Sequence, residues 1–67
     1  MQTGIIKYYN HIKGFGFIIC ESTNKEYYIH SSKIKYQLKL MKGDKAEFEP
    51  VEENDKLQAI NVELIFD

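Results

Sequence analysis

Short runs of isoleucine, phenylalanine and tyrosine, separated by polar turns, limit the fold of this chain more than any other feature of its sequence. No long stretch repeats its apolar residues every 3.6 positions, so the pattern favours strands over helices. The strands that we expect are Gly4–Asn10, Gly16–Cys20, Glu26–His30, Lys45–Val51 and Gln58–Phe66.

The connections between these segments indicate the order of the strands. Short polar turns link the first three into a meander, and Ser31–Lys42 forms a long connection with one helical turn. Pro50 cannot donate to a ladder and belongs at a strand edge or end. Glu52–Lys56 is expected to be a charged, mobile loop. This arrangement fits an all-β, five-stranded Greek-key barrel, although an SH3-like barrel also has five short strands.

A chain of 67 residues makes one domain, residues 1–67, with a small core and no room for a deep cleft. Its function is therefore expected on the surface. The single cysteine, Cys20, cannot form an internal disulfide, and no segment reaches membrane-spanning length. These features favour a reducing, cytoplasmic setting.

The net charge of −1 conceals two halves of opposite sign. Residues 1–42 carry seven lysines and two acidic residues, a net charge of +5. Residues 43–67 carry two lysines and eight acidic residues, a net charge of −6. A basic, aromatic half beside an acidic half indicates a polyanion as partner, while two simply solvated surfaces are the alternative interpretation.

The stretch KGFGFI, Lys13–Ile18, carries the strongest functional signal. Side chains alternate between the two faces of a strand, so Phe15 and Phe17 share one face while Ile18 and Cys20 share the other. The core takes the second pair, which places both phenylalanines outside. Gly16 adds no side chain on the core side and lets the strand coil tightly.

The third strand continues the same outer face. Ile29 and Tyr27 are expected in the core, so Tyr28 and His30 lie on the face of the phenylalanines. Neighbouring aromatic side chains that remain exposed usually mark a binding site. Every nucleobase has a flat π-face that can stack on such rings, and this predicts a single-stranded nucleic acid as the ligand.

The first strand supplies the remaining candidates. Lys7 and Lys13 are well placed to meet phosphates. Ile6 is expected in the core, and in a regular strand only one of the adjacent Tyr8 and Tyr9 can face the ligand. Strong coiling or a bulge would turn both tyrosines toward the rim.

At these residues the sequence resembles the bacterial cold-shock domain family. Thr3–Asn10 is similar to the opening strand of the family, KGFGFI matches its first ribonucleoprotein motif, Tyr28–His30 is similar to the second, and Gln58–Val62 resembles the last strand. The resemblance implies an oligonucleotide-binding (OB) barrel that binds single-stranded RNA or DNA and acts as an RNA chaperone or a regulator of transcription or translation. The contacts it implies are Lys7, Tyr8, Lys13, Phe15, Phe17, Tyr28 and His30.

The chain departs from the family pattern at several positions. Tyr8 replaces a tryptophan, and Ser31 replaces a phenylalanine. Asp55 and Leu57 stand where the family often has a basic residue and a proline, and Tyr36 is the candidate for the aromatic residue of the long connection. We therefore expect weaker binding than in a typical member, by about one lost stack of roughly 1–3 kcal/mol.

Two other functions compete with this prediction. The aromatic face of an OB barrel with reduced nucleic-acid binding could instead dock a peptide or a second copy of the chain. A catalytic or metal site could be built from His11, Cys20 and His30, but they lack CxxC or HxxxH spacing, and a buried thiol is inert. We expect no enzyme activity, no cofactor, no metal, no membrane partner and no small-molecule substrate, and a monomer or weak dimer.

Overall fold

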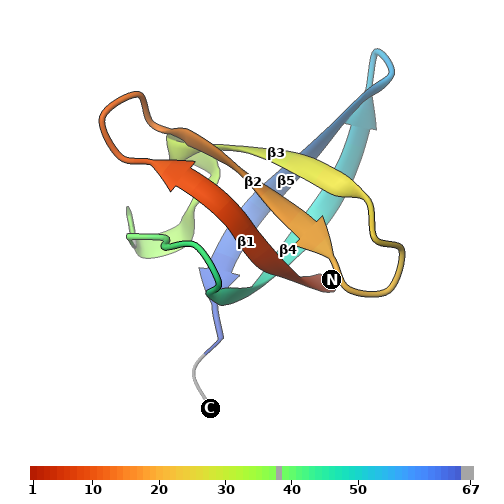
Figure 1. Ribbon diagram of the computed structural model, residues 1–67. Helices are drawn as coiled ribbons and strands as arrows, with labels where there is room; N and C mark the ends of the chain where they lie inside the picture. Colours follow the sequence, from red (N-terminus) through yellow and green to blue (C-terminus); the bar gives the residue numbers. More distant parts are fainter. Residues whose placement is uncertain (38, 66–67) are drawn as a thin grey trace.

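The computed structural model describes residues 1–37 and 39–65 and forms a closed barrel (Figure 1). The strands are β1 (Gln2–Asn10), β2 (Phe15–Cys20), β3 (Glu26–His30), β4 (Lys45–Glu53) and β5 (Lys56–Leu64). Their order around the barrel is β1-β2-β3-β5-β4, and β4 closes onto β1. The β3–β5 pair is parallel, whereas the other neighbouring pairs are antiparallel. The predicted five-stranded OB barrel is confirmed.

The long acidic hairpin of β4 and β5 differs from the prediction. Glu52 and Lys56 do not belong to a loop, because Glu52 pairs with Leu57 and Glu53 with Lys56. Only Asn54 and Asp55 form the turn, with φ of 52° and 63°. Asn and Asp tolerate these left-handed values, which a two-residue hairpin turn requires at both positions. The charged side chains therefore continue the ladder, and the hairpin projects from the barrel (Figure 1).

Two further features of the strands bear on the predictions. Pro50 does not end the strand, because it lies within β4 and pairs with Ala59 of β5. It lies beyond the part of β4 that pairs with β1, which ends at Phe48, so its missing N–H removes no bond from the β1–β4 ladder. Phe66, the expected end of the last strand, lies outside the described residues.

The connection from β3 to β4 contains two short 3₁₀ segments, η1 (Ser31–Lys33) and η2 (Lys35–Gln37), where one helical turn was predicted. Ile34 lies between them, is buried, and bridges to Val62 of β5. Leu40, further along the connection, is fully buried. These two side chains fix the connection to the barrel. No helix in the described part of the chain is long and apolar enough to cross a membrane.

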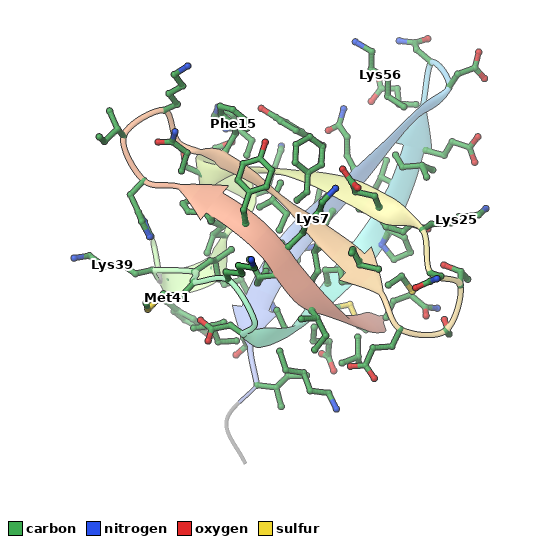
Figure 2. All side chains as sticks on the ribbon, in the orientation of Figure 1. Lys7, Phe15, Lys25, Lys39, Met41 and Lys56 are labelled. Carbon is green, nitrogen blue, oxygen red and sulfur yellow. The ribbon has the colours of Figure 1, made fainter. Side chains whose placement is uncertain are left out.

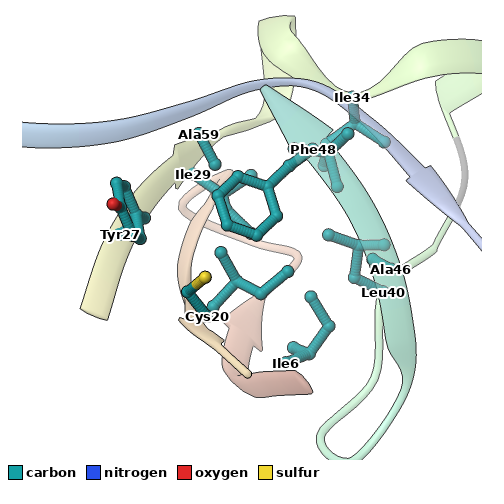
Figure 3. Close-up of a cluster of buried hydrophobic side chains, with 11 residues drawn as sticks. Ile6, Cys20, Tyr27, Ile29, Ile34, Leu40, Ala46, Phe48 and Ala59 are labelled. Carbon is teal, nitrogen blue, oxygen red and sulfur yellow. The ribbon is translucent and has the colours of Figure 1, made fainter. Parts of the chain in front are cut away.

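Figure 3 shows the core, in which side chains from every strand meet inside the barrel. Ile18, Cys20 and Ile29 are at most 1% exposed and Tyr27 is 8% exposed, so the inward assignments made from alternation are confirmed. Phe48 is the largest fully buried side chain, and its ring centroid lies 5.2 Å from that of Tyr27. Among the described residues, the cluster consists of Ile6, Ile18, Cys20, Tyr27, Ile29, Ile34, Leu40, Ala46, Phe48, Ala59 and Val62.

Candidate nucleic-acid interface

A β-bulge in β1 decides which of its side chains face outward. Ile6 pairs with Ile18 and points into the core, but the register then shifts, so that Tyr8 pairs with Phe17. In a regular strand Tyr8 would share the inner face with Ile6. The extra residue, Lys7, reverses the alternation and leaves both Lys7 and Tyr8 exposed on the outside.

Four aromatic rings gather on this outer surface. The ring of Tyr8 lies 6.3 Å from Phe15 and 5.5 Å from Phe17, and the ring of Tyr28 lies 6.1 Å from Phe15 and 5.7 Å from Phe17, all between centroids. We call these four residues, which come from β1, β2 and β3, the aromatic face. Tyr8 is 40% exposed and the other three are half-buried, so the rings remain open to solvent. The structure brings together all four aromatic residues that the sequence singled out.

Tyr9 does not join the aromatic face, although a bulge is present. It is half-buried, packs against the core cluster, and meets His11 with ring centroids 4.9 Å apart. Burial raises the pKa of Tyr9, and a hydrogen bond with Ser31 partly offsets this effect. Gly16 lies opposite Tyr9, where a Cβ would come within 2.7 Å of a ring carbon of the tyrosine. A glycine is therefore needed between the two outward phenylalanines.

Lys7 forms an ion pair that was not predicted from the sequence. Its Nζ donates to Oε2 of Glu26 at 2.9 Å, which joins β1 to β3 across the intervening β2. The hydrogen bond with Glu26 and its negative charge raise the pKa of Lys7. Glu26 lies two residues before Tyr28 on the same side of the strand, so strand alternation was the signal that could have found it.

Lys13 lies in the loop that precedes Phe15. The side-chain oxygen of Asn10 accepts hydrogen bonds from the backbone N–H groups of Ile12 and Lys13, at 2.9 and 3.0 Å. Gly14, with φ of 75°, donates to the carbonyl of Asn10 and completes the turn. Lys13 is exposed, and it takes part in none of the ion pairs among the described residues. It is therefore a cation available at one end of the aromatic face. Figure 2 shows Lys7 and Phe15 on the outer side of the strands.

His30 ends β3 beside the aromatic face, opposite Phe15 in the register, and is exposed. Its Nδ1 lies 2.8 Å from the hydroxyl oxygen of Ser32 and also accepts from the backbone N–H of Ser32. These contacts cap the first 3₁₀ segment and fix the ring. Nε2 takes part in none of the hydrogen bonds found within residues 1–37 and 39–65.

Of the positions at which the chain departs from the family pattern, Tyr8 belongs to the aromatic face and the others lie outside it. Ser31 is exposed, and its backbone N–H donates to the carbonyl of Gly14 at 2.9 Å. Tyr36 is 77% exposed, and it forms none of the ring pairs found in the described part of the chain. Asp55 and Leu57 border a hollow of about 650 Å³ next to Phe17. The rest of that hollow is lined by Glu26, Tyr28, Lys56 and Gln58.

Cys20 and the two histidines do not form a common site. Cys20 points into the barrel, where its sulfur lies 3.3 Å from the hydroxyl of Ser22, while His30 lies outside. Among residues 1–37 and 39–65, no three His, Cys, Asp or Glu side chains gather as metal ligands.

Alkylation of Cys20 should be slow in the folded protein. Hydrogen bonds with Ser22 and Thr23 lower the pKa of the thiol to about 7, but the residue is only 1% exposed. Labelling by iodoacetamide then needs local opening, so we expect it to be at least about 100-fold slower than in the urea-unfolded chain. Rapid labelling of the native protein at neutral pH would contradict this result and would favour a catalytic role for the Cys20 thiol.

The closed barrel, with an outward aromatic face on β1–β3, defines a protein of the OB class. The model of the 'Cold-shock' DNA-binding domain matches residues 2–65. The chain belongs to this cold-shock domain family, whose members bind nucleic acid.

The sequences of related cold shock proteins align with almost the whole chain. A cold shock-like protein of Aquifex aeolicus is 36% identical over 64 residues, which is 92% of this chain and 91% of the relative. The cold shock-like protein CspA of Stigmatella aurantiaca is 39% identical over 67 residues, which is 97% of this chain and 98% of the relative. Among solved structures, drosophila Unr CSD456 superimposes with a TM-score of 0.78 at 23% identity, over 96% of this chain and 26% of that chain, and shows the fold alone.

Proposed function

We propose that this protein binds single-stranded RNA or DNA by stacking bases on the aromatic face, and that it acts as an RNA chaperone or as a regulator of transcription or translation. The observation that carries the proposal is the contact of four aromatic rings on the outer surface of the barrel, with centroids 5.5–6.3 Å apart. Folding alone does not require aromatic rings there, because the core is filled by other side chains. Unpaired bases present the π-faces that such rings bind.

The charges around the aromatic face favour a strand held by stacking with few phosphate contacts. The β1–β2 loop and the β4–β5 hairpin lie at opposite ends (Figure 1), and the loop carries Lys13 while the hairpin carries Asp55. Lys7 is already paired with Glu26. A strand on this surface is therefore neutralised by few lysines, and a footprint of about six nucleotides matches the size of one OB barrel.

The affinity should depend only moderately on salt. If about two or three lysines meet phosphates, the slope of log affinity against log salt for single strands is about −1.5 to −2. Replacement of Lys13 by glutamine should make that slope shallower by about 0.7. The matched control is Lys45→Gln, because Lys45 pairs with Glu21 away from the aromatic face. A much steeper slope in the parent protein would show that the lysines of the connection also bind.

A phenylalanine at Ser31 should strengthen binding. The position follows His30 and is exposed, so a ring there adds a platform beside the aromatic face. One additional stack of roughly 1–3 kcal/mol corresponds to about 5-fold or more in affinity. Ser31→Ala, which removes the hydroxyl without adding a ring, is the control and should leave affinity nearly unchanged. Equal affinities for Ser31→Phe and Ser31→Ala would contradict the account of this position.

A titration followed by tyrosine fluorescence tests the proposed function. Tyr8 and Tyr28 belong to the aromatic face, so a bound oligopyrimidine of about six nucleotides should quench their emission at low salt. The same sequence in a duplex hides its π-faces and should quench little. If the single strand produces no quenching at low salt, the proposal is wrong and the barrel is better explained as a protein-interaction module.

A further inference from the structure

The aromatic face continues into the hollow of about 650 Å³ that lies between it and the β4–β5 hairpin. Phe17 and Tyr28 form its aromatic side, and the turn residue Asp55 and the first residues of β5 form the opposite side. The parallel pairing of β3 with β5 sets Gln58 opposite Tyr28, which places the amide of Gln58 beside the rings. A base stacked at this end of the face would therefore meet polar groups at its edge.

The polar groups that border the hollow are mainly hydrogen-bond acceptors. Glu26 uses Oε2 for Lys7, at 2.9 Å, and retains Oε1. The carboxylate of Asp55 makes no ion pair or side-chain hydrogen bond within the described part of the chain. Gln58 contributes both a donor and an acceptor. Lys56 is exposed at the hairpin (Figure 2), and its long side chain can reach a phosphate of a bound strand.

We propose that Glu26 and Asp55 make this hollow a base-selecting subsite that favours cytosine over uracil. The inference rests on the proposed function and assigns a specificity to one end of the same surface. Asp55 stands where the family often has a basic residue. Its carboxylate then selects a base, besides weakening the attraction of phosphate.

The two bases differ in the atoms that a carboxylate can read. Cytosine carries an amino group at C4, whose two N–H groups can donate to both carboxylates. Uracil carries a carbonyl oxygen there, which only accepts, and its single donor at this edge, N3–H, can serve one carboxylate at most. An ionised carboxylate has only acceptors, so it bonds the amino group and repels the carbonyl oxygen. The two pyrimidine rings have the same size, so their stacking on Phe17 and Tyr28 is similar. A difference in affinity between cytosine and uracil therefore measures the hydrogen bonding at the edge of the base.

The experiment compares two oligonucleotides of about six nucleotides, one of deoxycytidine and one of deoxyuridine, titrated at neutral pH with tyrosine fluorescence. A base-edge contact of this kind discriminates by about 1 kcal/mol or more, so the cytidine strand should bind about 5-fold tighter. In the double variant Glu26→Gln/Asp55→Asn the preference should fall to near unity, because carboxamides offer donors as well as acceptors. The ratio of the two affinities cancels the general effect of lost negative charge.

Glu52→Gln is the matched control, because Glu52 lies on the same hairpin but does not line the hollow. It should leave the cytidine preference unchanged. Equal binding of the two strands, a preference for uridine, or a preference that survives the double variant would overturn the base-selecting role. If both strands bind equally and binding is lost in Phe15→Ala/Phe17→Ala, only the inference fails. If neither strand binds, the proposed function fails with it.

Discussion

Replacement of Phe15 and Phe17 together by alanine is expected to weaken binding of a single-stranded hexanucleotide by about 30-fold or more. Each ring is half-buried on the outside of β2 and contacts both Tyr8 and Tyr28. Each lost stack costs roughly 1–3 kcal/mol, so two stacks together account for about 2–6 kcal/mol of the binding free energy. The core residues that alternate with these phenylalanines are untouched, so the barrel should remain folded.

Fluorescence titration measures the affinity, and circular dichroism checks the fold. The control is Ile5→Ala/Met41→Ala, which removes two exposed apolar side chains, 37% and 66% exposed, that lie outside the aromatic face. That control should bind as the parent protein does. An equal loss in both double variants would mean that exposed apolar surface in general promotes binding, and unchanged affinity in the phenylalanine variant would refute stacking on β2.

Phe48→Ala should destabilise the barrel by about 3–5 kcal/mol. The ring is fully buried and packs on Tyr27 in the middle of the core (Figure 3). A domain of this length has a total free energy of unfolding of about 3–10 kcal/mol. The substitution therefore removes from about a third to all of the free energy of unfolding.

Urea unfolding followed by circular dichroism measures this loss of stability. Phe48→Leu, which keeps most of the apolar volume, should cost much less and serves as the control. A free energy of unfolding for Phe48→Ala within about 1 kcal/mol of the parent value would show that the core is not centred on this ring.

Strand alternation predicted which side chains of β2 and β3 fill the core and which lie on the aromatic face. Ile18 and Cys20 alternate with Phe15 and Phe17, and the two pairs cannot both lie inside a two-sided strand. The structure buries the first pair and leaves the second outside. Because β3 begins and ends as predicted, Tyr28 and its neighbours also lie on the expected faces. In β2 and β3, the alternation of side chains along each strand was enough to predict which residues face outward.

The features that the sequence did not reveal depend on pairing between distant residues. Glu26 becomes the partner of Lys7 only when β1 and β3 lie on either side of β2, a separation of 19 residues. Gln58 reaches Tyr28 only through the parallel β3–β5 pair. The separate directions of Tyr8 and Tyr9 depend on where the bulge falls, which the register with β2 decides.

The most direct test of the central claim is to map the bound strand by NMR, using amide shifts of the ¹⁵N-labelled protein during titration with a hexanucleotide. Binding on the aromatic face predicts that the largest shifts fall on β2, on Lys7 and Tyr8 of β1, and on Tyr28 to His30. The middle of β4, around Glu49, should hardly respond. Shifts concentrated on β4, or no shifts at all at low salt, would contradict the claim that this protein binds single strands on its aromatic face.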